Sequence, residues 1–427
     1  MSKRKSLKTA ELPAQAVEKR RGARQERSLE RRARMADAAI EIVASHGVAG
    51  LTHRLVAARA GVSLAATTYY FDTKYDIVAA ASSVTLRGYV DSFRRAAERI
   101  RAEGPNPDVF RRFAGRLVHN AAHRDRARTV CWAEIMLDAH RHPQSLALSR
   151  QWFVELETVW LAIAKAAGVR HAPQVARSAI DLVIGLLFVT IGLGLNERQV
   201  DAVLAQGQDP LEEWRVPPAP EPEGATATRL TRKSADTRER ILAATVDTLI
   251  TDGPGAVSYR SVATRAGLTQ AAPFYHFLTI GALLAAAQQR LFEQSKQRYR
   301  LGAAADHGDA FNVERLIDRT ATVFLREATE FSSKNLAAFA IWLEADRNAD
   351  LRPMIWSVIV DQHLAWQRVL GRLMPTQRPL DALLAQAAFI GKMVRVLATG
   401  SATEDLALIR GELAHDLTGI ARGQFWL

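Results

Sequence analysis

The chain has 427 residues, of which 48% are apolar, so we expect two to four domains with ordinary hydrophobic cores. Its one cysteine, Cys131, excludes an intrachain disulfide and fits a reducing cytoplasm. The net charge is +12 at pH 7, and much of it lies near the N-terminus.

The first 34 residues hold twelve Lys and Arg side chains against four Glu. This segment lacks the apolar core of a signal peptide, so we expect a cytoplasmic protein with no membrane association. A basic block of this kind is either a solvated tail or, beside a DNA-reading motif, a segment that follows phosphates. The second interpretation is favoured, and we expect a flexible basic arm over residues 1–33.

The sequence contains an internal repeat. Shifting it by 206 positions aligns residues 34–81 with residues 240–287 without a gap, and 17 of these 48 positions are identical. The same shift later pairs Leu137 with Leu343, Arg141 with Arg347, Trp160 with Trp366 and Gly185 with Gly391. Because the same shift of 206 positions aligns residues over this length, the sequence predicts two tandem halves with the same fold.

Helical spacing of apolar residues dominates both halves, as in the series Met35, Ala39, Ile40 and Val43, which Gly47 is placed to end. No alternating run is long enough to predict a sheet, so we expect an all-α fold. The apolar stretch from Leu182 to Leu195 is 14 residues long. A membrane span needs roughly 20 residues, so this stretch is better interpreted as a buried helix.

Residues 51–71 have the pattern of a helix-turn-helix. Thr52 can cap a short helix whose inner face carries Val56, Ala57 and Ala60. Gly61 permits the positive φ of a tight turn, and Ser63 can cap the next helix.

This stretch, with its aromatic ending Tyr69-Tyr70-Phe71 followed by Asp72-Thr73-Lys74, resembles the TetR family of transcriptional regulators. Phe274-Tyr275-His276-Phe277 in the second half is similar to the same ending. The resemblance implies two tandem TetR-like units, each with a helix-turn-helix head and a helical body, packed as an intramolecular pseudo-dimer. It also implies double-stranded operator DNA and an unidentified small-molecule effector as partners.

By the same resemblance, a recognition helix over residues 64–70 would lie in the major groove. Base contacts fall to Leu64, Ala65 and Thr67, and phosphate contacts to Thr52, Arg54, Tyr69 and Lys74, with Ser63 at the start of the helix. The second-half counterparts are Ser258, Arg260, Thr269, Gln270, Ala271 and Tyr275. The two tyrosines could instead be core residues with surface hydroxyls, and the two arginines ordinary solvated side chains.

The second head departs from the pattern at three positions. Pro273 replaces Thr67 inside the recognition helix, where the first turn tolerates it. Leu278 and Ile280 replace Asp72 and Lys74, which removes a phosphate donor. Two interpretations of the second head therefore stay open: binding to another half-site, or a role as a scaffold.

The predicted domains are the heads at 34–81 and 235–287 and the bodies at 82–207 and 288–427. A linker over 208–234 joins the halves and contains five prolines, at positions 210, 217, 218, 220 and 222. In the family the last two long helices form a four-helix dimer bundle. Here helices near 150–167 and 173–195 would pair with those near 354–373 and 379–400, with close approach at Gly185, Gly192, Gly194 and Gly391.

Candidate ligand-binding residues are His119, His123, Cys131, Trp132 and Glu134 in the first body and Phe339, Trp342 and Glu344 in the second. For any one of them, structural packing is favoured over ligand contact. His140-Arg141-His142 is better interpreted as a solvated turn than as a metal site. We expect no metal, no cofactor and no catalytic residues, because no nucleophile, phosphate-loop or paired-carboxylate pattern is present.

The sequence thus predicts a ligand-responsive regulator, by preference a repressor, whose unlike recognition helices read an asymmetric operator. Two alternatives stay open: a less sequence-specific architectural DNA-binding protein driven by the basic arm, and a ligand-binding scaffold whose second head no longer binds DNA. Further homodimerisation of the chain also stays open.

Overall fold

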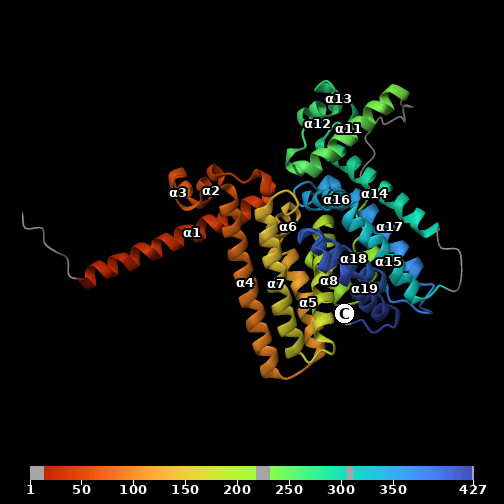
Figure 1. Ribbon diagram of the computed structural model, residues 1–427, viewed down its shortest axis with the longest axis horizontal. Coiled ribbons are helices and arrows are strands. Elements are labelled where there is room, and N and C mark those ends of the chain that lie inside the picture. The colour runs from red at the N-terminus through yellow and green to blue at the C-terminus, as the bar shows by residue number, and fades with distance from the viewer. Residues whose placement is uncertain (1–13, 218–230, 305–310, 426–427) are drawn as a thin grey trace, which may run out of the picture.

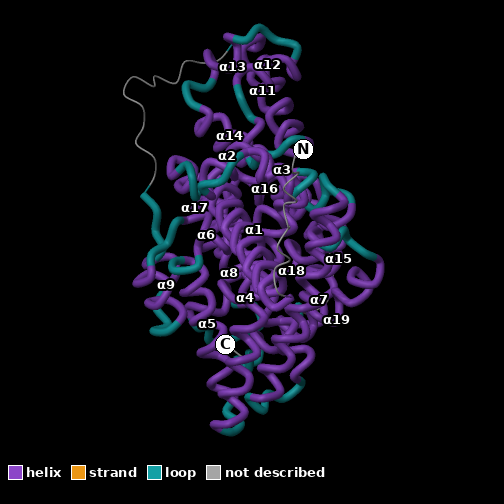
Figure 2. The backbone as a smooth tube through the Cα atoms, turned by 90° about the vertical axis from the view of Figure 1, so that its left-hand side faces the viewer, coloured by secondary structure: helices purple, strands orange, loops and turns teal. Residues whose placement is uncertain are grey.

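The structure of the protein is a computed structural model that describes residues 14–217, 231–304 and 311–425. Within these ranges the chain is built from helices, with no strand (Figure 2). The first half contains α1 (Ala14–Gly50), α2 (His53–Ala60), α3 (Leu64–Tyr70), α4 (Lys74–Glu103), α5 (Pro107–Ala122), α6 (Arg126–Asp138), α7 (Pro143–Ala166), α8 (Ala172–Leu193), α9 (Glu197–Leu204) and α10 (Pro210–Glu213). The second half contains α11 (Arg232–Thr251), α12 (Tyr259–Ala266), α13 (Ala271–His276), α14 (Ile280–Ala304), α15 (Val313–Thr329), α16 (Ser332–Glu344), α17 (Arg352–Leu370), α18 (Pro379–Ala398) and α19 (Thr403–Ala421), with short 3₁₀ turns at Pro254–Ala256 and Ala349–Leu351.

The predicted repeat and the all-α fold are confirmed by the order of the helices. Helices α1 to α8 are followed by the same series in α11 to α18, and both α2 and α6 recur in α12 and α16 with their bounds shifted by the repeat length. Figure 1 shows the two bodies side by side, with the first head at one side of the molecule and the second head above the other body. The duplication is therefore one of three-dimensional structure as well as of sequence.

The two bodies meet where α8 crosses α18. The contact is so close that a Cβ atom added at Gly185 would overlap the backbone oxygen of Ala387, and one added at Gly391 would overlap that of Asp181. Only glycine fits at these two equivalent positions, as expected. The other two glycines play smaller parts. Gly192 makes ordinary contacts with its neighbours, and Gly194 caps the end of α8 with a φ of +63°.

Helix α8 is long and apolar enough to cross a membrane by length and composition alone, and it is the one such helix among the described residues. In this fold, however, 94% of its most apolar window is buried inside the protein. The interpretation of Leu182–Leu195 as a buried helix is thus confirmed, and α8 is the central core helix of the first body.

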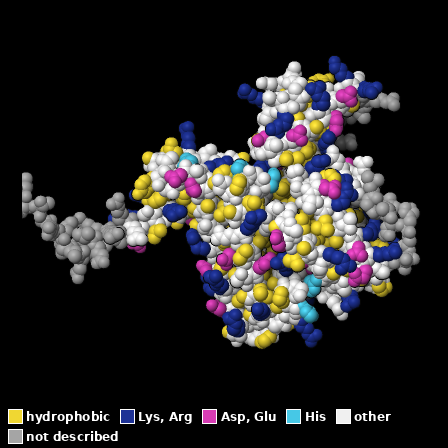
Figure 3. Space-filling model, in the orientation of Figure 1, with side chains coloured by type: hydrophobic (Ala, Val, Ile, Leu, Met, Phe, Trp, Pro, Cys, Tyr) yellow, Lys and Arg dark blue, Asp and Glu magenta, His cyan; other side chains and the backbone are white. Residues whose placement is uncertain are grey.

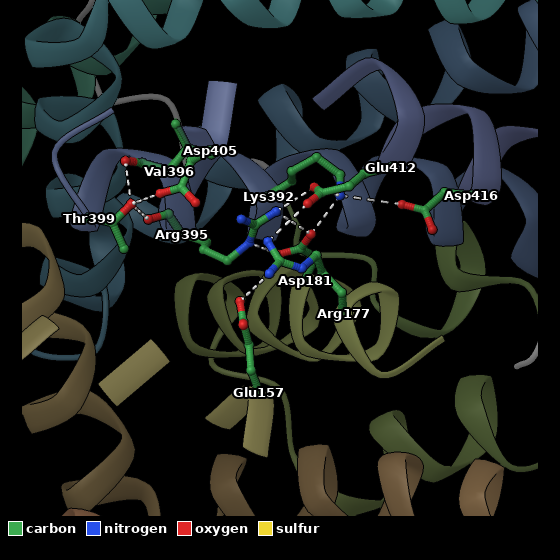
Figure 4. Close-up of polar contacts among 10 residues, drawn as sticks. All are labelled: Glu157, Arg177, Asp181, Lys392, Arg395, Val396, Thr399, Asp405, Glu412 and Asp416. Atoms are coloured by element: carbon green, nitrogen blue, oxygen red, sulfur yellow. Dashed lines mark hydrogen bonds and ion pairs between the residues drawn. The ribbon is translucent and has the colours of Figure 1, made fainter. Parts of the chain in front are cut away.

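A charged cluster lies inside the α8–α18 contact (Figure 4). The Asp181 carboxylate on α8 accepts hydrogen bonds from Lys392 Nζ at 2.6 Å and from Arg395 Nε at 2.7 Å, both on α18. All three side chains are almost fully buried. Burial alone would raise the pKa of Asp181, but the adjacent Arg395 and Lys392 lower it below its ordinary value. Glu412 on α19 joins the cluster, 2.8 Å from Lys392 and 2.5 Å from Arg395.

Two expected boundaries need correction. Residues 14–33, expected in a flexible arm, form the first turns of α1, which projects from the body (Figure 1). Residues 208–217, expected in the linker, pack on the first body, where Trp214 is buried and donates from Nε1 to the Gln199 backbone oxygen at 2.8 Å. The rest of the expected arm (residues 1–13) and most of the expected linker (residues 218–230) lie outside the described residues.

Candidate nucleic-acid interface

The first head is a three-helix unit whose turns are fixed by side-chain caps. Thr52 accepts a hydrogen bond from the Leu55 amide at 3.2 Å and starts α2, and Ser63 accepts one from the Ala66 amide at 3.2 Å and starts α3. Gly61 between them has a φ of +63°, the left-handed conformation that glycine adopts at low cost. The helix-turn-helix predicted from the sequence is therefore present, with α3 over the expected residues 64–70.

One face of α3 is exposed at the outer end of the head. Leu64 is 52% exposed and Tyr69 is 79% exposed, and Ala65 and Thr68 lie between them on the same face. Figure 3 shows apolar side chains gathered at this end of the first head. A short, capped helix with small and apolar side chains on its free face can enter a major groove and contact base edges there.

Thr67 was assigned to base contact, and this assignment is wrong. Its side chain is fully buried and donates a hydrogen bond to the Leu64 backbone oxygen at 2.8 Å. The exposed neighbour Thr68 takes its place on the free face. The helical period explains the error, because residue 67 points towards the head core when 64, 65 and 68 point outwards.

We expect Thr68→Ala to change which bases the protein prefers, because this side chain lies on the free face of α3. The matched variant Thr67→Ser keeps the buried hydroxyl and should leave the preferred sequence unchanged. Selection of bound fragments from a random DNA library measures both preferences. A changed motif for the Thr67 variant, with an unchanged one for Thr68→Ala, would contradict this placement.

The side chains expected to bind phosphates lie around α3. Thr52 and Arg54 are exposed at the start of α2, and Lys74 is half-buried with Nζ 5.2 Å from the centroid of the Tyr75 ring. Tyr70 instead packs inwards and donates its hydroxyl to Ser28 Oγ at 3.0 Å, which ties α3 to α1. Phe71 is buried in the core of the head.

The second head has the same plan with a weaker recognition helix. Ser258 caps α12, and Gly267 repeats the positive φ at 62°. Helix α13 begins one residue later than its counterpart and has no side-chain cap, and Pro273 is buried in its first turn. Its exposed face carries Gln270, Ala271, Phe274 and Tyr275, with Thr269 and Arg260 also exposed. The two heads therefore offer different side chains to a groove.

Each body contacts the head of the other half through one arginine. Arg141, just after α6, donates to the backbone oxygens of Leu249 at 2.8 Å and Ile250 at 3.1 Å, at the end of α11. Its repeat equivalent Arg347, just after α16, donates to the backbone oxygen of Ala44 at 3.2 Å, in the last turns of the helical part of α1 before Gly47. These crossed contacts were not predicted, because the segment 140–142 was interpreted as a solvated turn. The one signal for these contacts in the sequence was that both halves have arginine at this equivalent position, Arg141 and Arg347.

Two family models match the chain. The model of bacterial regulatory proteins, tetR family, matches residues 36–81, and the model of the tetracyclin repressor-like C-terminal domain matches residues 105–207 and 312–420. The chain belongs to the TetR family. The matched residues fall within the regions assigned from the sequence to the first head and to the two bodies.

Two solved structures are similar to parts of this TetR-family chain. One is a transcriptional regulator from Rhodococcus sp. Rha1, with 20% identity, a TM-score of 0.38, and coverage of 44% of this chain and 96% of that one. The other is the multidrug binding protein EbrR complexed with imidazole, with 22% identity, a TM-score of 0.35, and coverage of 42% and 93%. No curated protein matches the sequence.

Each body of this TetR-family chain contains a cavity. The cavity of the first body is about 460 Å³ and is lined by α4, α5, α6, α7 and α8, and that of the second is about 470 Å³ and is lined by the equivalent helices. Of the expected ligand-binding residues, Trp132 lines the first cavity and Phe339 and Trp342 line the second.

The remaining expected ligand residues have structural roles or positions away from these cavities. Glu134 pairs with Arg347 of the other half, and Glu344 pairs with the same arginine within its own half. Burial raises the pKa of Glu134, although Arg347 opposes this. His119 Nδ1 lies 3.0 Å from Asp201 Oδ1. His123 and Cys131 do not line the first cavity, and burial raises the pKa of the Cys131 thiol. Among the residues that the structure describes, no group of three His, Cys, Asp or Glu side chains is arranged to hold a metal ion.

Proposed function

We propose that the protein is a cytoplasmic, ligand-responsive transcriptional repressor that binds one operator with both heads of a single chain. The observation that carries the proposal is the capped helix α3, whose outer face is free to enter a major groove. The membership of the TetR family supports DNA binding and regulation. The sign of regulation, the single-chain arrangement and the form of the operator are part of the proposal.

The single-chain arrangement is supported by the charges at the α8–α18 crossing. At the positions equivalent to Asp181, Lys392 and Arg395, the other half has Ala387, Leu186 and Val189. Two first halves would therefore bury a carboxylate against aliphatic side chains, and two second halves would bury the cations against Ala387 instead of Asp181, with Glu412 left to balance both. Because burying an unpaired charge is costly, the halves pair with each other rather than with copies of themselves.

The operator is expected to be asymmetric because the two reading faces differ. Leu64 and Thr68 on α3 are replaced by Gln270, directly before α13, and Phe274 on α13. A glutamine side chain can pair with adenine through two hydrogen bonds, whereas leucine offers only apolar contact to a thymine methyl. One chain on DNA would thus read two unlike half-sites.

Ligand response is supported by the placement of α6 and α16. Trp132 on α6 lines the first cavity, and Arg141 follows the same helix and holds the second head. Trp342 on α16 lines the second cavity, and Arg347 follows that helix and holds α1 of the first head. A ligand that shifts either helix would move the opposite head and change the spacing of the two recognition helices.

The test is a genome-wide selection of bound DNA fragments with wild type, Tyr69→Ala and Tyr275→Ala. Both tyrosines are exposed, at 79% and 84%, so the variants should fold normally. We expect an asymmetric motif for wild type, with one half-site lost in each variant, and one chain per operator by analytical ultracentrifugation. A symmetric motif bound by two chains would overturn the single-chain arrangement. Binding of wild type without sequence preference would favour the architectural alternative.

A second candidate function is that of a repressor whose second head is only a scaffold. The observation in its favour is the uncapped six-residue α13, which is followed by Leu278 and Ile280 instead of an aspartate and a lysine. In that case only the Tyr69 variant loses binding, and Tyr275→Ala selects the same fragments as wild type.

A further inference from the structure

The two body cavities occupy equivalent places in the repeat but have different linings. Trp160, Ile184 and Leu187 in the first correspond to Trp366, Ile390 and Met393 in the second. Beyond these shared positions the two linings diverge in charge and polarity. The difference in lining makes different ligands possible in the two halves.

The inner wall of the first cavity is aromatic. It includes Phe93, Trp152 and Trp160, all buried, together with the partly buried Phe113. Trp152 donates its Nε1 hydrogen to Ser82 Oγ at 2.8 Å. Trp132, only 7% exposed, has an Nε1 donor that is buried without a partner. A buried donor left unpaired costs free energy, so a ligand with an acceptor group near it would be favoured there.

Four arginines line the exposed part of the same cavity. Arg95 and Arg99 come from α4, Arg116 from α5 and Arg128 from α6, and all are solvent-exposed. None of the four makes a hydrogen bond or ion pair with another described residue. Arg124 nearby is different, because it pairs with Asp125 at 2.9 Å. Four positive charges from three helices, none of them paired with a carboxylate of the described residues, favour the binding of an anion at this opening.

The second cavity differs in its interior and in the state of its cations. At the positions of Leu156 and Ile180 it has Gln362 and Gln386, and Thr322, the equivalent of Arg116, does not line it. The cations that line it are Arg298, Arg319, Lys334 and Arg368, of which Arg298 pairs with Glu327 at 2.7 Å and Lys334 donates to Gln294 Oε1 at 3.5 Å. Gln386 is buried and donates to Gln362 Oε1 at 3.2 Å, while its own Oε1 has no partner. This interior suits a ligand that offers hydrogen bonds rather than one with a plain hydrocarbon body.

We propose that the cavity of the first body binds an amphipathic organic anion. Its hydrocarbon or aromatic body would lie among Trp132, Trp152 and Trp160, and its acidic head would be bound by the arginines at the opening. Arginine matches a carboxylate with two parallel hydrogen bonds, which makes a carboxylate head the simplest probe. This inference rests on the proposed function as a ligand-responsive regulator and specifies the class of ligand.

The experiment is isothermal titration calorimetry of the full chain, without DNA, using matched pairs of probes. Hexanoate, decanoate and tetradecanoate are each compared with the alcohol of the same chain length, below the concentration at which they aggregate. At least one carboxylate should bind about tenfold more tightly than its alcohol, because hydrogen bonds to charged groups are the stronger ones. The double variant Arg99→Gln, Arg128→Gln should lose this preference while its affinity for the alcohol stays within about twofold.

The matched control is Lys334→Gln, which changes the residue equivalent to Arg128 in the second cavity and should keep the preference. The inference is overturned if no carboxylate binds better than its alcohol, or if the double variant keeps the preference. Operator binding of the same proteins is measured separately without probe. A chain that prefers carboxylates but binds no operator would refute the proposed function and leave this inference standing.

Discussion

Replacement of Asp181 by alanine is expected to lower the free energy of unfolding by about 3–5 kcal/mol, the usual cost of removing one partner from a buried ion pair. Asp181 is fully buried and accepts hydrogen bonds from both Lys392 and Arg395. Without it, the two cations keep Glu412 as their nearest acceptor, on one side only. Urea denaturation monitored by circular dichroism measures the difference.

The control is the triple variant Asp181→Ala, Lys392→Leu, Arg395→Val, which gives each position the residue of the other half. Apolar replacement of buried ion pairs is often neutral, but Glu412 and Asp416 lose Lys392 in this variant, so part of the lost free energy should return. In the triple variant, two first halves or two second halves from different chains should also be able to pair. The variant should therefore form larger assemblies. If the triple variant is less stable than the single one, the cluster does not act as described.

The same pair of proteins gives a pH dependence. Because the pKa of Asp181 is lowered in the folded state, its contribution is fully present above its unfolded value of about 4 and is lost as pH falls further. The stability difference between wild type and Asp181→Ala should therefore be constant between neutral pH and about pH 5 and shrink below about pH 4. A difference that instead shrinks towards alkaline pH would contradict the lowered pKa.

Caps, turns and close helix contacts of this fold could be predicted from the sequence because they depend on local chemistry. Thr52, Gly61 and Ser63 act on residues within four positions of themselves, so their capping and turn roles followed from type and spacing alone. The repeat then carried the same assignments to the second half. Gly185 and Gly391 were recognisable because glycine on a long apolar helix has few reasons other than close approach.

Residues whose partners lie in the other half could not be assigned in this way. Glu134 was taken for a ligand-binding residue, but its partner Arg347 is 213 positions away, and no local pattern reveals the pair. The assignment of Thr67 to base contact was wrong for a different reason. The rotation of a seven-residue helix is set by how the head packs, and a change of one position exchanges the buried and exposed threonines.

A second large effect is expected when an arginine that contacts the opposite head is removed. Arg141→Ala should loosen the second head, and Arg347→Ala should loosen the first. Each guanidinium binds backbone oxygens near the end of the first helix of the opposite head, where a positive charge is favoured. Loss of hydrogen bonds to a charged group costs about 1.5–3 kcal/mol, so amide exchange in the affected head should rise about tenfold or more. Hydrogen exchange read by mass spectrometry separates the peptides of α11–α13 from those of α1–α3.

Arg150 offers a matched control, because it also crosses between the halves but ends on the body, donating to the Thr399 backbone oxygen at 3.1 Å. Arg150→Ala should leave exchange in both heads unchanged. Since Arg347 also neutralises the buried Glu134, the variant Glu134→Gln is combined with Arg347→Ala to separate the two effects. If each arginine variant loosens the head of its own half, coupling runs within the halves, and a ligand in one body would act on the head of the same half.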